Sequence, residues 1–179
     1  MAKQVNSTYG DALFDLAVEE KQVDSILEEL TGLLQIMEEN EELLTLMTHP
    51  EVLKDDKLKM LENIFKGRVS DAVMGTLLIV VKNDRSAELP AICAYVIGRL
   101  KEYKRIGIAY VTSAAPLTQE QKAKIEERLI ATTDYVTMEM HYKEDASLIG
   151  GLIIRMEDRV VDSSIKRQLE RMSATLSQG

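Results

Sequence analysis

The side chains best suited to acid–base chemistry in this chain are its carboxylates, which number 30 among 179 residues. A general acid and a general base require two carboxyl groups in one pocket, with pKa values that their surroundings drive apart. The densest acidic run, residues 38–42, is instead typical of a solvated helix start, where negative charge opposes the positive end of the helix dipole. The sequence therefore nominates no catalytic pair, and an acid/base hydrolase is a less favoured hypothesis.

Metal and thiol chemistry have little support in the sequence. The two histidines, His49 and His141, are far apart and lack the Cys/His spacing of a zinc site. The single cysteine, Cys93, cannot form an intrachain disulfide, and it falls on an apolar helical stripe. We expect a small buried hydrophobe there, because a reactive thiol needs a basic and exposed setting.

The glycine pair Gly150-Gly151 is the most informative local feature. A phosphate-binding loop would end in Gly-Lys-Ser or Gly-Lys-Thr before a helix, whereas this pair precedes an apolar strand pattern. Glycine at a strand start permits close backbone approach or a bulge. No serine lies in a nucleophile-elbow pattern. The sequence thus predicts no catalytic residue, no cofactor and no metal ligand.

Composition and charge restrict the class of partner. An apolar content of 45% supports packed cores. A net charge of -8 disfavours nucleic acid and anionic lipid, which need clustered Lys and Arg, and no tryptophan is present for base stacking. No apolar run reaches the ~18 residues of a membrane span, and the first residues lack the apolar core of a signal peptide. We expect neither nucleic-acid binding nor direct membrane insertion.

Helical periodicity dominates the first 105 residues. It predicts six helices, over about residues 5–18, 25–37, 43–47, 55–66, 71–82 and 88–103. Pro50 breaks the pattern after the third helix, Gly67 ends the fourth, and Ser70 is suited to cap the fifth. The short connections favour an antiparallel bundle.

The pattern changes after Arg105. It predicts a strand over 106–113, a helix opened by a capping box at 118–121, an alternating strand over 136–142, a strand from Gly151, a strand over 159–161 and a final helix over 164–176. This is a β-α-β-β-β-α order. The predicted fold is mainly α with a smaller α+β part: an N-terminal six-helix bundle over residues 1–105 and a C-terminal α/β domain over residues 106–179.

Two helices carry more apolar surface than a small bundle requires. The first has apolar residues on two opposite sides, and the fifth is apolar almost all round. Either these helices are central, or together they offer a groove to another helix. Burial of a Leu or Ile from such a partner would contribute roughly 1.5 to 3 kcal/mol, so a few anchors could offset the entropy lost on docking.

Three groups of residues form a pattern that spans nearly the whole chain. They are Tyr9, Ala12, Leu13 and Phe14; Asn83, Arg85, Leu89 and Pro90; and Asp145, Leu148, Gly151, Ile153, Ile154, Arg155, Asp162, Ser164, Leu169 and Arg171. The pattern resembles that of the delta subunits of bacterial F-type ATP synthases, relatives of the mitochondrial oligomycin-sensitivity-conferring protein. Gly150 is often alanine in that family.

The resemblance implies where partners bind. In that family the first and fifth helices receive the amphipathic N-terminal helix of an alpha subunit, which implies a groove formed by Tyr9, Ala12, Leu13, Leu16, Thr76, Ile79 and Val80. The C-terminal part meets the b subunits of the peripheral stalk, which implies a basic contact through Lys166, Arg167 and Arg171, with ordinary solvated charge as the alternative. The remaining signature residues are expected to serve folding: Gly150, Gly151, Arg155, Asp162, Ser164 and Leu169. Among them, Asp162 with Ser163 or Ser164 is expected to cap the last helix.

The function implied by the resemblance is mechanical. The chain would be a non-catalytic stator subunit, present as a single copy in a hetero-oligomeric complex at the cytoplasmic face of the bacterial cell membrane. It would link the catalytic head to the stalk, so that proton-driven rotation is coupled to ATP synthesis. A helical interaction module outside the ATP synthase is the alternative, with the same groove and another partner. The hydrolase hypothesis would require a concave pocket with raised carboxylate pKa values.

Overall fold

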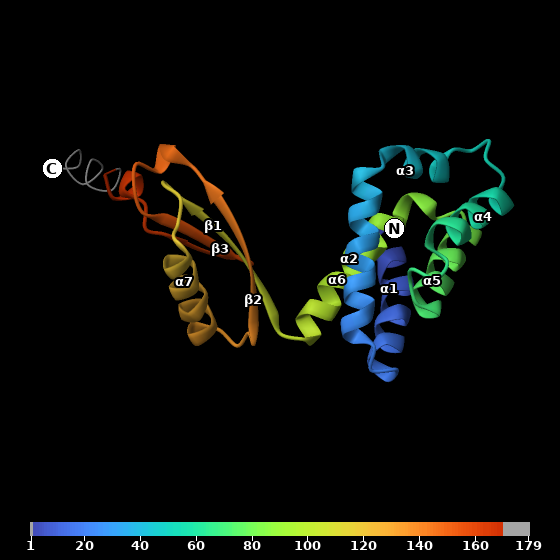
Figure 1. Ribbon diagram of the computed structural model, residues 1–179, viewed down its shortest axis with the longest axis horizontal. Helices are drawn as coiled ribbons and strands as arrows, with labels where there is room; N and C mark the ends of the chain where they lie inside the picture. The colour runs from blue at the N-terminus through green and yellow to red at the C-terminus, as the bar shows by residue number, and fades with distance from the viewer. Residues whose placement is uncertain (1, 170–179) are drawn as a thin grey trace. The chain divides into compact units, whose positions relative to one another are not determined.

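The computed structural model describes residues 2–169, which form two compact units that divide between Leu100 and Lys101 (Figure 1). The predicted boundary at Arg105 lies slightly further along the chain, after the last helix of the bundle has ended. The fold is mainly helical in its first part and has a mixed four-stranded sheet in its second. The predicted fold class is therefore confirmed.

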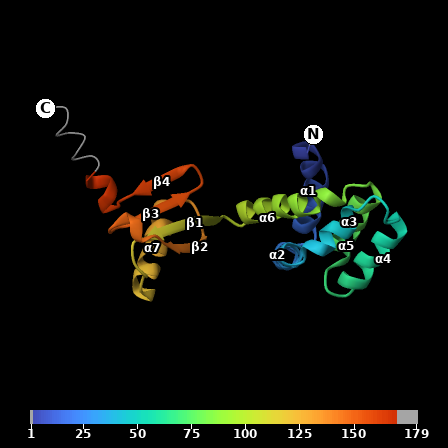
Figure 2. The same ribbon diagram turned by 90° about the horizontal axis from the view of Figure 1, so that it is seen from above.

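The N-terminal unit consists of helices whose bounds follow the predicted ones closely (Figures 1 and 2). They are α1 (Ala2–Glu19), α2 (Val23–Glu39), α3 (Glu41–Thr48), α4 (Lys54–Phe65), α5 (Asp71–Lys82), the 3-10 turn η1 (Ser86–Glu88) and α6 (Leu89–Tyr103). The Ser70 hydroxyl accepts a hydrogen bond from the amide of Val73 at 3.5 Å, so the predicted cap of α5 is present.

The core of this unit is apolar and draws on every helix. Its largest fully buried side chains include Ile26, Leu30, Leu33, Met37, Met47, Leu61, Phe65, Val73, Val80, Val81, Leu89 and Leu100. On α5, four residues are buried while Ile79 is exposed. The nearly all-round apolar character of α5 therefore has mainly a structural cause, since most of its circumference faces the core.

The C-terminal unit contains one sheet in the order β2-β1-β3-β4. Strands β1 (Ile106–Ser113) and β2 (Thr137–Glu144) are parallel and are joined through α7 (Gln119–Thr132). Strands β3 (Leu152–Met156) and β4 (Arg159–Asp162) form an antiparallel hairpin, and the 3-10 turn η2 (Ala146–Leu148) precedes β3. Leu129 and Ile130 of α7 pack on a small core of Ala109, Met138 and Met156.

Local signals account for most of these elements. The predicted capping box is present at α7, where Thr118 and Gln121 exchange hydrogen bonds of 2.9 and 3.3 Å. The alternation of β2 places Met138 in the core, but Val136 precedes the strand and is exposed. The amide of Val136 instead donates to the carbonyl of Arg105, which pairs the approaches to β2 and β1.

The signature residues Asp162, at the end of β4, and Ser164 cap the next helix. The amide of Ser164 donates to the Asp162 carboxylate at 2.9 Å, and the amide of Arg167 donates to the Ser164 hydroxyl at 3.3 Å. Residues 165–169 are helical, as predicted. The predicted remainder of that helix to residue 176 lies outside the described residues.

Candidate interaction surface of the helical unit

Helices α1 and α5 pack against each other (Figure 1). Most of the predicted docking residues therefore lie on neighbouring helices. Two of them do not belong to a free surface. Leu13 is 3% exposed and Val80 is 0% exposed, which makes both part of the core in the described chain. The sequence places them only one residue from the exposed Ala12 and Ile79, and one residue turns a helix by ~100°. The assignment of Leu13 and Val80 to an open groove is therefore corrected.

Five predicted residues do reach the surface. We call Tyr9, Ala12, Leu16, Thr76 and Ile79 the α1/α5 surface. Ala12 is exposed, Ile79 is 53% exposed, and the other three are half-buried. Residues 9, 12 and 16 share one face of α1, and residues 76, 79 and 83 share one face of α5, by their spacing.

A hydrogen bond joins these two faces at one end. The side-chain amide nitrogen of Asn83 donates to the hydroxyl oxygen of Tyr9 at 2.9 Å. Asn83 belongs to the turn that the sequence pattern singles out with Arg85, Leu89 and Pro90. In that turn Arg85 pairs with Glu88 at 3.1 Å, and Leu89 is buried. The turn thus contributes both to folding and to the edge of the α1/α5 surface.

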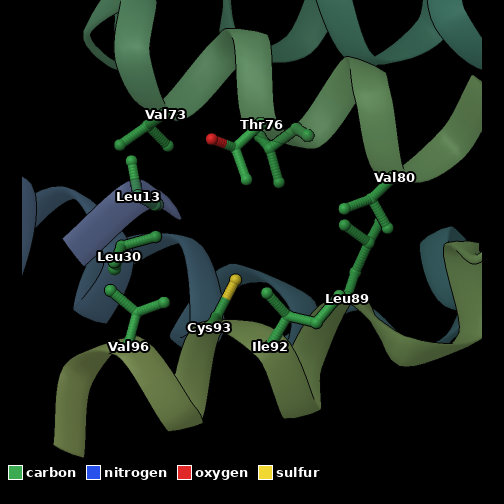
Figure 3. A pocket seen from close by; sticks show the side chains of 10 residues that line it. Leu13, Leu30, Val73, Thr76, Val80, Leu89, Ile92, Cys93 and Val96 are labelled. Atoms are coloured by element: carbon green, nitrogen blue, oxygen red, sulfur yellow. The ribbon is translucent and has the colours of Figure 1, made fainter. Parts of the chain in front are cut away.

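Behind the α1/α5 surface lies a small cavity of about 10 Å³ (Figure 3). Its walls are almost wholly apolar and include Leu13, Val73, Thr76, Val80 and Cys93. The Thr76 hydroxyl donates to the carbonyl of Ala72 at 2.9 Å, so it needs no partner in the cavity. A space this small is at the lower limit for one water molecule. The cavity is therefore too small to admit a side chain of another molecule.

The second apolar side of α1 is held by α6. The Asp11 carboxylate accepts hydrogen bonds from Tyr95 at 2.8 Å and from Arg99 at 3.0 Å, and the Arg99 guanidinium lies 4.8 Å from the ring centroid of Phe14. A Cβ atom on the buried Gly10 would stand 2.4 Å from the Tyr95 ring. These contacts fix α1 and explain its two-sided apolar pattern. Sequence reasoning missed this link, because its members lie more than 80 residues apart.

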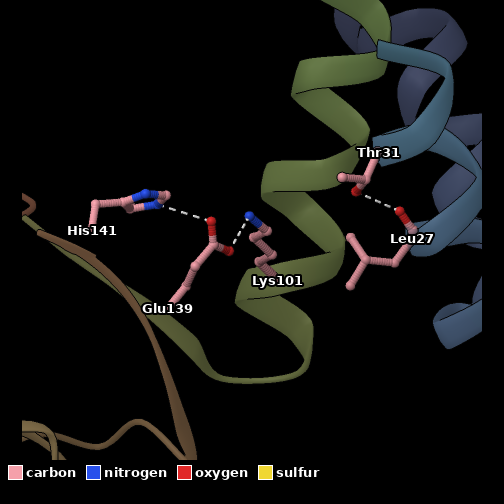
Figure 4. Close-up of polar contacts among 5 residues, drawn as sticks. All are labelled: Leu27, Thr31, Lys101, Glu139 and His141. Carbon is pink, nitrogen blue, oxygen red and sulfur yellow. Dashed lines mark hydrogen bonds and ion pairs between the residues drawn. The ribbon is translucent and has the colours of Figure 1, made fainter. Parts of the chain in front are cut away.

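A polar cluster occupies one face of the C-terminal sheet. Glu139 accepts a hydrogen bond from Lys101 at 2.5 Å and contacts His141 at 2.9 Å (Figure 4). The His141 ring in turn stacks on Tyr110, with ring centroids 4.9 Å apart. The hydrogen bond from Lys101 is the main cause that lowers the pKa of Glu139. Lys101 and Glu139 thus form an ion pair on this face. In the helical bundle, Figure 4 also shows a local hydrogen bond, which the Thr31 hydroxyl donates to the carbonyl of Leu27 at 2.7 Å.

The predicted stalk residues are only partly described. Lys166 is exposed, and Arg167 pairs with Asp162 at 3.4 Å. Arg171 lies outside the described residues. The pairing of Arg167 with a cap residue gives its charge a role in folding.

Features of an enzyme site do not assemble in the described part of the chain. Each described carboxyl group with a resolved shift, namely Glu139, Asp145 and Asp162, has its pKa lowered by hydrogen bonds and nearby cations. The hydrolase hypothesis required a raised carboxylate pKa. Among residues 2–169 no group of three or more His, Cys, Asp or Glu is arranged to hold a metal ion. Within that same range, no helix has the length and apolar character that crossing a membrane demands.

Comparison with known proteins decides the family. The model of the ATP synthase delta (OSCP) subunit family matches residues 5–176. The chain belongs to this family. As a delta/OSCP subunit it is a non-catalytic stalk component of a complex for ATP synthesis and proton transport.

Individual relatives agree over almost their whole length. The ATP synthase subunit delta of Lachnoclostridium phytofermentans is 49% identical over 176 residues, which cover 98% of this chain and 97% of the relative. That of Enterococcus hirae is 32% identical, with 97% and 96% covered. A chain in the cryo-EM structure of the Toxoplasma gondii mitochondrial ATP synthase hexamer shares the fold, with a TM-score of 0.72, 16% identity and 96% of each chain covered.

Proposed function

We propose that this delta/OSCP-family chain ties the catalytic head of the ATP synthase to its peripheral stalk through two separate contacts. The α1/α5 surface binds the N-terminal helix of an alpha subunit, and the C-terminal unit binds the b subunits. The head is thereby held still while proton flow turns the rotor, so that rotation is coupled to ATP synthesis. The match of the family model over residues 5–176 is the observation that carries this proposal.

The chemistry of the α1/α5 surface suits an amphipathic helix. Ile79 projects a large apolar side chain that is 53% exposed, while the small side chain of Ala12 lets a second backbone come close. Covering such groups contributes about 25 cal/mol for each Å² of apolar area removed from water. Tyr9 and Leu16 are half-buried and flank this contact on α1. The affinity therefore comes mainly from apolar anchors, as in other helix-in-groove complexes.

The stalk contact has a different character. Lys166 is exposed and Arg167 is only partly engaged by Asp162, so this end of the C-terminal unit presents positive charge in a chain whose net charge is -8. Exposed ion pairs contribute ~0–1 kcal/mol each and are screened by salt. Charge at Lys166 and Arg167, together with Arg171, therefore orients an acidic stalk segment, and binding of the b subunits weakens as salt is raised.

Titration calorimetry with the full chain tests the first contact. The probe is a synthetic peptide of the N-terminal helix of the alpha subunit. Ala12→Asp and Ile79→Asp should each weaken binding at least ~10-fold, because each would bury an unpaired carboxylate. The matched controls are Ala94→Asp, at an exposed alanine of α6, and Leu46→Asp, at a 46% exposed leucine of α3.

All four positions are exposed, so a change in binding can be told apart from a loss of folding. The controls should bind the peptide as the unchanged chain does, and circular dichroism should show all four variants folded. Normal binding by both Ala12→Asp and Ile79→Asp would contradict the proposed site. Unfolding of these two variants alone would instead place the residues in the core.

A further inference from the structure

We propose that Asn83 is a positioning residue of the α1/α5 surface. Its side-chain amide holds the Tyr9 hydroxyl so that the hydroxyl proton is offered to an acceptor oxygen on the docked alpha-subunit helix. This inference rests on the proposed function, because it presupposes that the helix docks on the α1/α5 surface. It assigns a role in partner binding to the asparagine of the turn between α5 and α6.

The direction of the hydrogen bond carries the argument. The nitrogen of the Asn83 amide can only donate, so at 2.9 Å the Tyr9 oxygen must accept. The Tyr9 hydroxyl makes no hydrogen bond as a donor to any residue in the described range. Its own proton is therefore available. The half-buried Tyr9 hydroxyl thus accepts one hydrogen bond from Asn83 and keeps its own proton for an acceptor on a partner.

The backbone of Asn83 is hydrogen-bonded at the end of α5. Its backbone amide donates to the carbonyl of Ile79 at 3.1 Å, which makes it the C-cap of the helix. The following residue, Asp84, has a positive φ of 58° and pairs with Lys54. Arg85 then pairs with Glu88 at 3.1 Å. The amide of Asn83 thus starts from a fixed backbone and loses little further freedom on holding Tyr9.

Asn40, in the same unit, is a helix C-cap whose side chain bonds within its own helix. Asn40 is the C-cap of α2, and its side-chain nitrogen donates to the carbonyl of Ile36 in its own helix at 2.8 Å. Asn83 occupies the equivalent place on α5 but directs its side chain to a different helix, α1. Capping therefore does not require the side-chain bond that Asn83 makes. The bond instead joins the end of α5 to Tyr9 of α1.

Docking of a helix makes the Tyr9 hydroxyl proton important for binding. A helix laid over Tyr9 removes the water that now solvates the hydroxyl, and a buried donor without an acceptor costs more than a hydrogen bond contributes. The docked helix must therefore supply an oxygen there. This oxygen comes either from a carboxylate or from one of the unpaired carbonyls in the last turn of that helix. A helix that lacks it is disfavoured, which makes Tyr9 and Asn83 determinants of specificity.

A double-mutant cycle on the full chain tests the proposal, with the alpha-subunit peptide as probe. The variants are Tyr9→Phe, Asn83→Ala and their combination, and Asn40→Ala and Tyr110→Phe serve as matched controls. Tyr9→Phe and Asn83→Ala should each raise the Kd about three- to tenfold, the range for one net hydrogen bond. The combined variant should raise the Kd no further, because both changes remove the same hydrogen bond from Tyr9 to the peptide. Asn40→Ala should lower Tm without changing the Kd, and Tyr110→Phe should change neither.

Two results would overturn the inference. In the first, Asn83→Ala binds the peptide with a Kd within about twofold of that of the unchanged chain. In the second, the Kd of the combined variant rises by the product of the two single fold-changes. If Ala12→Asp weakens binding while Asn83→Ala does not, the positioning role fails and the docking site stands. If Ala12→Asp also binds normally, both proposals fail. A peptide with its carboxylates replaced by amides identifies the acceptor. If the acceptor is a carboxylate, Tyr9→Phe should no longer change the Kd for this peptide. If it is a backbone carbonyl, Tyr9→Phe should raise the Kd as before.

Discussion

The backbone of Gly151 lies against the backbone of Ser163, so closely that a Cβ atom on Gly151 would stand 2.3 Å from the Ser163 carbonyl oxygen. Gly151 also has a positive φ of 78°, a conformation that glycine adopts without strain. The amide and hydroxyl of Ser163 both donate to the carbonyl of Leu152, at 3.0 and 2.9 Å. Gly151 is therefore required at the start of β3, because the backbone there lies directly against Ser163, the residue after β4.

Gly151→Ala should lower the free energy of unfolding of the C-terminal unit by about 2 kcal/mol or more, because it combines an unfavourable φ with a backbone clash. Gly150→Ala is the matched control. Its Cβ would meet the side chain of Ile165, with Cδ1 at 2.5 Å and Cγ1 at 3.2 Å, and this side chain can shift where a backbone cannot. We expect a change below about 1 kcal/mol there. Urea denaturation followed by circular dichroism measures both, and equal losses would contradict this account of the glycine pair.

Glu29 of α2 fastens the start of α5. One of its carboxylate oxygens accepts hydrogen bonds from both the amide and the hydroxyl of Ser70, each at 2.8 Å. Glu29→Ala should therefore destabilise the bundle by about 1–2 kcal/mol, since it removes an acceptor from a partly buried backbone amide. Glu28→Ala, at an exposed neighbour on the same helix, should have little effect. Thermal unfolding measures the Tm of both variants. Similar Tm values for Glu29→Ala and Glu28→Ala would argue against a stabilising role of the Glu29 carboxylate.

Sequence reasoning succeeded where the signals are local. The bounds of α5 agree with the predicted range 71–82, because Ser70 marks its start and apolar residues fill its length. The strand β1 followed from a run of β-branched and aromatic residues, and α7 followed from its capping box. Each of these signals lies within a few residues of the element it defines.

The proposed docking face was harder to predict, because it depends on how a helix is rotated against its neighbours. Leu13 and Val80 have the same apolar character as the exposed Ile79, and periodicity alone does not separate them on helices with apolar residues on several sides. The hydrogen bond between Tyr9 and Asn83 joins residues 74 positions apart. Only the packing of α1 on α5 brings that pair together.

Cys93 should resist modification in the folded chain. Burial raises the pKa of its thiol to about 12, so at pH 8 only about one molecule in ten thousand carries the reactive thiolate. A thiol reagent should react with it only after unfolding in urea. As a control, Ala94→Cys places a thiol at the exposed adjacent position of α6, where it should react readily in the folded state. Rapid labelling of Cys93 in the native chain would show that the core around it opens.

Glu139 should make the stability of the C-terminal unit depend on pH. The hydrogen bond from Lys101 lowers its pKa below the ordinary value of 4.5, with a smaller contribution from His141. Because the folded chain binds this proton more weakly than the unfolded chain does, the stabilisation is fully present above about pH 4.5 and is lost as the pH falls through the folded pKa.

Comparison of the chain with Glu139→Gln in urea, across this pH range, measures that effect. The unchanged chain should be the more stable at pH 7, and the difference should shrink steadily below pH 4.5. Glu144→Gln, at an exposed position on the same strand, is the matched control and should show a smaller difference. In Lys101→Met the carboxyl resonance of Glu139 should titrate at a higher pH than in the unchanged chain. An unaltered titration there would mean that another group, rather than the Lys101 ammonium, sets the pKa of Glu139.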